Sequence, residues 1–351
     1  MKFQAILLAA FSAAIASTPA EARDNIEDSY GFLNITSSAR AYGLGGINIS
    51  DICSDINYVD QNPALLGPEF GTQVGFNYMR YIASSNFAGV KFGKGAGEHS
   101  AWGVGLQYWG YGSIESTDEN GNTLGDFSPK DIAVSGTYSR ADTFTGFITH
   151  DMEFALKNAG ATLRMIYSSY DSYTAVALAT DLGVNYYDPE RDLSFSVVVA
   201  NLGGQVKRFD ETYHRLPFDI RAGWTQSFGT FPVRFSVTAW NLTKWHLPYY
   251  DEGDGSESDP GKMVDSFGSN LLRHLVFAAD FIPSERFYLG IGYNYKTRTD
   301  MSSYSRSLLS GVSLAAGLRL KAFSLGLAFA QPHKSASTFM VNISTRLSEL
   351  L

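Results

Sequence analysis

The chain has 351 residues, a formal net charge of −8 and a single cysteine, Cys53. An acidic chain without basic clusters is poorly suited to bind nucleic acid, and one cysteine excludes an intramolecular disulfide. Aromatic residues make up 14% of the chain and there are 34 glycines, a composition common in exported β-proteins and outer-membrane barrels.

The first 22 residues have the pattern of a secretory signal peptide. Lys2 is followed by an apolar run at residues 5–16 and by Ala20-Glu21-Ala22, which resembles a cleavage site. We predict a signal peptide at 1–22, and therefore export, although a buried N-terminal helix is the alternative. No later run of about 18 apolar residues predicts a membrane-spanning helix.

Residues 23–69 have neither a helical nor a strand period, and we predict that they form a plug segment. Leu44-Gly45-Gly46 belongs to no phosphate-binding glycine motif, so these glycines are expected in turns. Asp51 and Asp55 are four residues apart, which a helical turn would place on one face. A metal or acid–base pair is disfavoured because no third ligand such as histidine is nearby. We predict instead that these carboxylates cap a helix and that one of them pairs with Arg40.

From residue 70 onward the sequence alternates with a period of two. In residues 173–187, bulky side chains such as Leu178 and Val184 alternate with small or polar ones such as Ala179 and Asp181. This alternation is typical of strands. The predicted strands are 70–82, 85–93, 100–112, 130–139, 155–169, 173–187, 192–202, 216–228, 231–242, 271–281, 286–298, 306–319, 322–331 and 338–348.

Many of these strands are long enough to cross a bilayer, which requires about 9–11 residues, and their number is even, as in single-chain bacterial barrels. We therefore predict an all-β fold: a transmembrane antiparallel β-barrel of about 14 strands over residues 70–351, located in the outer membrane. A secreted β-sandwich is the alternative, because alternation alone does not distinguish lipid from a protein core.

The gaps between strands alternate in length as expected for outer loops and periplasmic turns. The long gaps at 113–129, 203–215 and 243–270 are predicted outer loops, and only the gap at 140–154 departs from the pattern. Binding tends to reside on loops held by a scaffold. The candidate partner-contact residues on these loops are Asp118, Asn120, Lys207, Tyr250, Asp251 and Asp254.

No catalytic or cofactor site is predicted. The six histidines are scattered, and neither H-E-x-x-H nor G-x-S-x-G is present. The acidic loop 249–262 could bind calcium through Asp251, Asp254 and Asp259, but it lacks regular ligand spacing, so a solvated outer loop is favoured. Trp109, Tyr111, Trp245 and Tyr249 lie near predicted strand ends and suit a membrane-interface belt or ordinary packing.

The N-terminal stretch "FLNITSSARAYGLGGINIS", an aspartate-bearing spacer and "NPALL" resemble the signature of the PorV/PorQ family, outer-membrane proteins of the type IX secretion system related to FadL-like channels. Later pieces, "LATDLGVNYY", "LPFDIRAGW" and "FYLGIGYNY", are also similar, and the length leans towards the PorQ type. The matching positions, which the resemblance places in the plug, are Ser38, Ala39, Arg40, Leu44, Gly45, Gly46, Asn62, Pro63, Ala64 and Leu65.

The resemblance implies a fourteen-stranded, FadL-like barrel with an N-terminal segment in its lumen. It also implies a non-enzymatic role in export or cell-surface attachment of cargo that carries a C-terminal signal domain. The implied partners are attachment-complex proteins, cargo C-terminal domains and outer-membrane lipid, with lipid or detergent possible in the lumen. The alternative function is a FadL-like channel for hydrophobic small molecules. One departure is the C-terminal "STRLSELL", because many outer-membrane barrels end in an aromatic residue.

Overall fold

The computed structural model describes residues 30–117, 122–145, 155–209, 213–228, 231–251, 253, 261–301, 309–333 and 336–350. The predicted signal peptide, residues 1–22, lies outside these ranges. None of the helices in the described ranges is both long enough and apolar enough to cross a membrane.

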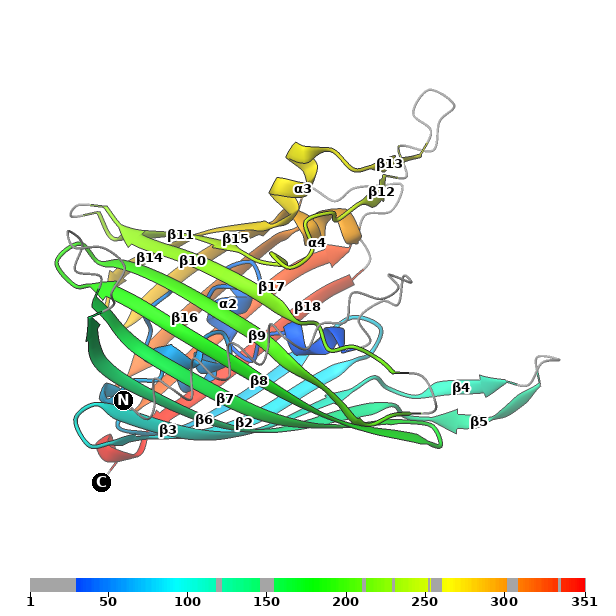
Figure 1. Cartoon of the computed structure of the whole chain (residues 1–351), viewed down its shortest axis with the longest axis horizontal. Helices are drawn as coiled ribbons and strands as arrows, with labels where there is room; N and C mark the ends of the chain where they lie inside the picture. The colour runs from blue at the N-terminus through cyan, green and yellow to red at the C-terminus, as the bar shows by residue number, and fades with distance from the viewer. Residues whose placement is uncertain are drawn as a thin grey trace.

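Fourteen antiparallel strands form a closed barrel, in which the first strand pairs with the last (Figure 1). The prediction of a fourteen-stranded barrel is confirmed. The strands are β1 (Thr72–Arg80), β2 (Asn86–Ala96), β3 (Ser100–Gly110), β6 (Lys130–Thr145), β7 (Ala155–Tyr170), β8 (Tyr173–Asp188), β9 (Leu193–Lys207), β10 (Asp219–Ser227), β11 (Val233–Ala239), β14 (Leu275–Ser284), β15 (Phe287–Asn294), β16 (Val312–Leu320), β17 (Phe323–His333) and β18 (Ala336–Arg346).

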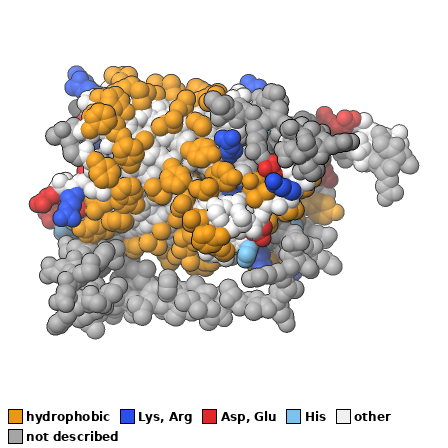
Figure 2. All heavy atoms as spheres, turned by 90° about the horizontal axis from the view of Figure 1, so that it is seen from above, with side chains coloured by type: hydrophobic (Ala, Val, Ile, Leu, Met, Phe, Trp, Pro, Cys, Tyr) orange, Lys and Arg blue, Asp and Glu red, His pale blue; other side chains and the backbone are white. Residues whose placement is uncertain are grey.

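The alternation in the sequence separates the two faces of this wall. The bulky positions point outward, where Phe76 and Leu163 are 53% and 60% exposed, and hydrophobic side chains cover much of the visible barrel face (Figure 2). The small and polar positions, such as Ala179 and Asp181, are buried inside the barrel. An apolar outer surface on a closed sheet is the arrangement of a membrane-spanning barrel, since every backbone group is paired within the wall.

Several strand ends differ from the prediction. β6 continues to Thr145 rather than 139, and β9 to Lys207 rather than 202, so part of the predicted loop 203–215 is barrel wall. β15 ends at Asn294 rather than 298, because the Asn294 side chain accepts a hydrogen bond from Thr297 N and begins helix α4 (Tyr295–Asp300). Of the irregular gap 140–154, residues 146–154 lie outside the described ranges.

The two ends of the barrel differ. Two-residue turns join β14 to β15 and β16 to β17 at one end, which is the periplasmic end of a bacterial barrel. The opposite end carries the predicted outer loops, and two of these contain secondary structure that the sequence reading did not predict (Figure 1). These additional elements are β4 (Ile114–Thr117), β5 (Thr123–Phe127), β12 (Tyr249–Asp251), β13 (Lys262–Val264) and α3 (Phe267–Arg273).

Residues 30–70 form short helical turns inside the barrel, where α2 is visible behind the wall in Figure 1. Side chains cap three of these turns: Ser38, Asp55 and Asn62 each accept a backbone N–H two or three residues ahead. We call residues 30–70 the luminal segment. Its elements are η1 (Gly31–Asn34), α2 (Ala39–Gly43), η2 (Ile56–Asp60), η3 (Pro63–Leu65) and η4 (Pro68–Phe70); a last turn, η5 (Leu347–Glu349), follows β18.

The predicted aromatic belt is wrong for two of its four residues. Trp109 is only 4% exposed and its ring packs 4.7 Å from that of Phe32 inside the barrel. The Tyr111 hydroxyl donates to Asp131 at 2.6 Å. Trp109 is at an inward position of β3, next to the outward Tyr108, so its direction follows from the strand register and not from its closeness to a strand end.

Candidate functional site

The centre of the luminal segment is a buried network of charges. Arg40 Nε lies 2.5 Å from Asp51 Oδ2, and Arg40 Nη2 lies 3.0 Å from Asp280 Oδ2 on β14. Arg234 Nη1 on β11 lies 2.8 Å from the other oxygen of Asp51, and its Nη2 lies 3.1 Å from Asp192. The predicted pairing of Arg40 with Asp51 is therefore confirmed. Each member of the pair also contacts a charged residue of the wall, Asp280 on β14 or Arg234 on β11.

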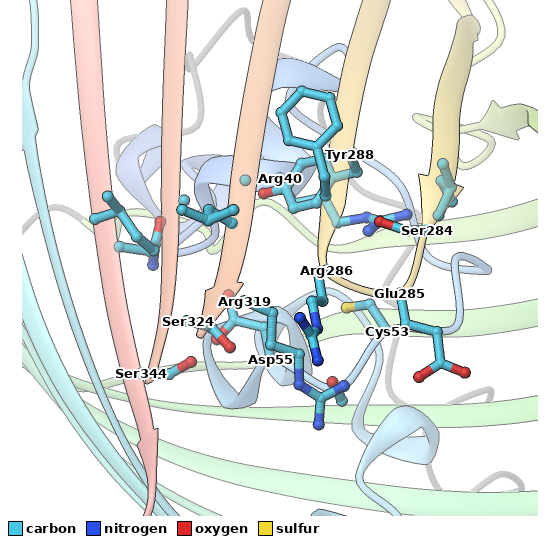
Figure 3. A pocket seen from close by; sticks show the side chains of 18 residues that line it. Arg40, Cys53, Asp55, Ser284, Glu285, Arg286, Tyr288, Arg319, Ser324 and Ser344 are labelled. Atoms are coloured by element: carbon cyan, nitrogen blue, oxygen red, sulfur yellow. The ribbon is translucent and has the colours of Figure 1, made fainter. Parts of the chain in front are cut away.

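The network favours the ionised forms of its luminal members. Burial by itself would raise the pKa of Asp51, but the Arg40 and Arg234 guanidinium groups hold this pKa below its usual value. Burial would lower the pKa of Arg40, but the carboxylates of Asp280 and Asp51 raise it well above normal. The Arg40 guanidinium also lies 4.5 Å from the centre of the Tyr288 ring, a cation–π contact visible in Figure 3.

The predicted helix-capping role is confirmed for Asp55 but not for Asp51, and no helical turn places the two carboxylates on one face. The Asp55 side chain caps η2, accepting hydrogen bonds from Asn57 N at 3.1 Å and Asn57 Nδ2 at 3.0 Å. Capping requires extended backbone at Asp55, which ends any helical turn from Asp51. Burial raises the pKa of Asp55, in contrast to that of Asp51.

A second network joins the luminal segment to β2 and β3. Lys91 Nζ on β2 forms an ion pair with Asp60 and donates to Ser37 Oγ at 2.8 Å. Ser37 Oγ in turn donates to Asp60 at 2.6 Å, and Gln107 on β3 also donates to this carboxylate. Burial would raise the pKa of Asp60, but the Lys91 charge lowers it overall.

The Asn-Pro-Ala-Leu run is held against the wall at two glycines. Asn62 donates to Ile49 O at 3.0 Å and accepts from Ala64 N at 2.9 Å. A Cβ at Gly160 on β7 would be 2.4 Å from the Pro63 carbonyl carbon, and one at Gly183 on β8 would be 2.0 Å from Asn62 Oδ1. The glycines of these strands therefore allow the luminal backbone to approach closely. Ala64 and Leu65 are buried.

The Leu44-Gly45-Gly46 run makes a similar contact on the other side. Gly45 and Gly46 have φ angles of 95° and 87°, a conformation that favours glycine. Gly45 N donates to Ser313 Oγ at 2.9 Å, and Gly45 O accepts from Asn294 Nδ2 at 3.1 Å. Near the start of α2, Asn342 on β18 accepts from Ala39 N and donates to Ser37 O. The luminal segment is thus bonded to strands on opposite sides of the barrel.

The predicted outer-loop residues are only partly placed. Lys207 lies at the end of β9, exposed, and donates to Thr174 Oγ1 at 2.5 Å. Tyr250 is exposed on β12 and Asp251 beside it is half-buried. Asp118, Asn120, Asp254 and Asp259 lie outside the described residues, and so does most of the proposed calcium loop. The part of the chain that the structure describes contains no cluster of metal-ligating side chains.

Three charged residues of the barrel wall that belong to these networks were not predicted from the sequence. They are Lys91 (the partner of Asp60), Arg234 and Asp280. Each lies on the small-residue face of its strand, as in "VKF", "VRFSV" and "FAADF". A charged residue on the inward face of a barrel strand must be solvated or paired. The inward position of these charged residues in their strands is therefore the feature of the sequence from which their pairing could have been predicted.

No protein-family model matches the chain, and no curated protein sequence does. Among solved structures, the chain is similar to the P. putida toluene transporter TodX, with 13% identity over 88% of this chain and 97% of that chain and a TM-score of 0.49. It is also similar to a Pseudomonas aeruginosa FadL homologue, with 10% identity over 88% and 98% of the two chains and a TM-score of 0.44. The chain's own fold defines its class: a closed, fourteen-stranded membrane barrel with a luminal N-terminal segment.

Proposed function

We propose that this protein is a non-enzymatic outer-membrane barrel that docks partner proteins at the cell surface, in the type IX secretion system whose PorV/PorQ proteins its sequence resembles. The observation that carries the proposal is the luminal segment, which fixes polar networks to strands on opposite sides of the wall. A lumen occupied in this way suits a scaffold better than an open conduit.

The outer loops supply a surface for such partners. Phe267 on α3 and Met263 on β13 are 70% and 64% exposed, and the exposed Tyr250 on β12 pairs with Met263 across the β12–β13 ladder. The Trp245 ring lies 5.6 Å from that of Phe267. Exposed apolar side chains gathered on structured loops are typical of protein-binding surfaces.

Capture from native outer membranes in mild detergent tests this proposal. We expect the wild-type chain to recover type IX attachment components. A variant with Phe267→Ser and Met263→Ser should recover fewer, and Arg191→Gln, at the opposite end of the barrel, should behave as wild type. Recovery of no type IX component, together with normal cargo secretion in a deletion strain, would reject the docking function.

The second candidate function is a channel for hydrophobic small molecules. A cavity of about 530 Å³ lies beside the luminal segment and is lined by Phe32, Met79, Phe87 and Trp109 among others, a size and lining suited to a small apolar ligand. This cavity is the observation that supports the second candidate function. TodX, one of the similar structures, is described as a toluene transporter. Uptake of labelled toluene into liposomes that contain the purified barrel, above the uptake into empty liposomes, would favour the channel.

A further inference from the structure

Two lysines lie on the lipid-facing side of the wall at its outer-loop end. Lys130 begins β6 and Lys207 ends β9, and both are exposed. Lys130 is on the same strand face as the exposed Val134, four residues along, and Lys207 pairs with Val176, an outward position of β8. Within the described ranges neither lysine forms a salt bridge. Both ammonium groups are therefore available to a ligand from the membrane side.

Hydroxyl groups lie between the two lysines. Lys130 pairs with Ser169 of β7, and Ser169 pairs with Thr174 of β8. Lys207 Nζ donates to Thr174 Oγ1 at 2.5 Å, which places its ammonium group at this row. Because β6, β7 and β8 are neighbours in the wall (Figure 1), the backbones of Lys130 and Thr174 are two strand spacings, or about 10 Å, apart. Lysine side chains are long and flexible, so both ammonium groups can approach one anion held above Ser169.

The outward rows next to these groups are aromatic and then aliphatic. Two residues further along each strand, Tyr108, Ile132 and Tyr167 are paired across β3, β6 and β7, and both tyrosines are exposed. The next row towards the centre of the wall contains the exposed pair Val134 and Met165. Exposed tyrosines followed by aliphatic side chains mark the boundary between lipid headgroups and hydrocarbon. The two lysines are therefore at the level of the headgroups of the outer leaflet.

Three carboxyl groups near this row have to be weighed against an anion. Asp131 is 0% exposed on the inward face of β6. Asp171, in the turn between β7 and β8, is exposed and accepts a hydrogen bond from Ser172 Oγ at 3.3 Å. Asp126 belongs to the separate two-stranded sheet of β4 and β5. The outward row itself carries two positive charges and two hydroxyl groups, and such donors recognise phosphate.

We propose that Lys130 and Lys207, with the hydroxyl groups of Ser169 and Thr174, bind a phosphate of lipopolysaccharide, the phosphorylated glycolipid of the outer leaflet. Its acyl chains lie along the tyrosine and aliphatic rows on the same face of the wall. The bound lipid fixes the depth of this side of the barrel in the membrane. Lys207, which the sequence predicted as a partner contact, is thereby assigned to a lipid contact. The site includes none of the exposed apolar residues of α3 and β13, so it stands or falls independently of the docking function.

Native mass spectrometry of the folded barrel in mild detergent tests the site, with purified lipid A, the phosphorylated anchor of lipopolysaccharide, as the probe. We expect the wild-type chain to bind lipid A at least about tenfold more tightly than its dephosphorylated form, a comparison that needs no variant. The K130Q/K207Q double variant should bind lipid A about tenfold to thirtyfold more weakly, because each lysine near the headgroups contributes one attractive charge. K94Q removes an exposed lysine from the outward face at the opposite end of the wall and should bind as wild type. Added salt should weaken the binding of the wild-type chain more than that of the double variant.

Three results would overturn the proposal. These are equal binding of lipid A and its dephosphorylated form, unchanged lipid A affinity in the folded double variant, and lysine-dependent binding of phosphatidylglycerol as tight as that of lipid A. Heat-modifiable migration in gels checks that each variant forms the barrel.

Discussion

Asp51→Asn is the substitution that should most affect the luminal segment. Asp51 is 1% exposed and forms ion pairs with Arg40 at 2.5 Å and with Arg234 at 2.8 Å. Removing one partner of a buried ion pair costs about 3–5 kcal/mol. Arg40 keeps Asp280 and Arg234 keeps Asp192 in the variant, so we expect the lower end of this range, about 3 kcal/mol.

Hydrogen exchange of the folded barrel in detergent measures this effect directly. A loss of about 3 kcal/mol should speed exchange of amides in residues 38–66 by roughly a hundredfold, since 1.4 kcal/mol corresponds to a factor of ten. Amides in the central barrel strands should keep their protection. Asp188→Asn, whose partner Arg191 is exposed and 3.9 Å away, is the matched control and should change little. Unchanged exchange in residues 38–66 of Asp51→Asn would refute the role assigned to the network.

Three further predictions concern the same segment. Gly160→Ala should destabilise the packing of the luminal segment by about 1–3 kcal/mol, because the new Cβ meets Pro63. Thermal unfolding should show this loss, whereas Gly136→Ala, whose Cβ meets no atom within 4 Å, should leave the melting temperature unchanged. Equal melting temperatures for the two variants would contradict the close approach of the luminal segment to Gly160. Asn62→Ala removes a cap and the bond to Ile49 O and should cost about 1–2 kcal/mol, visible as faster exchange in residues 62–66; wild-type rates there would contradict it. Asp51 and Asp60 have lowered pKa values, so their stabilisation is present above the unfolded pKa of about 4 and is lost as the pH falls through the folded values. Exchange corrected for intrinsic rates should therefore rise on acidification below this pH. Asp55 has a raised pKa, so its contribution has the opposite sign, and Asp55→Asn should retain protection at pH 7 where Asp51→Asn loses it.

The sequence predicted the barrel because lipid and lumen impose opposite demands on alternate residues. In β8, for instance, Leu178 faces outward and Asp181 inward, as the alternation required. The strand ends were less predictable where a side chain decides them, as Asn294 does for β15. The end of β9 was also missed, because the strand extends to Lys207 although glycines 203 and 204 resemble a turn signal.

The candidate site was predictable only in part. Arg40 and Asp51 are eleven residues apart, and Arg40 is the only lysine or arginine in residues 30–70, which made their pairing foreseeable. Asp280 and Arg234 approach Arg40 and Asp51 only because the barrel closes, and no local pattern encodes such distant contacts. The capping role predicted for Asp55 is confirmed, but the turn that it begins, Ile56–Asp60, could not be located from the four-residue spacing of Asp51 and Asp55.

Single-channel conductance of the purified barrel in planar bilayers tests the central claim, that the luminal segment keeps the barrel from acting as an open pore. We expect no stable conductance for the wild-type chain and a clear increase when Asp51→Asn is combined with Asp60→Asn, which weakens both networks. A wild-type chain that conducts steadily, at a level these substitutions leave unchanged, would contradict the claim.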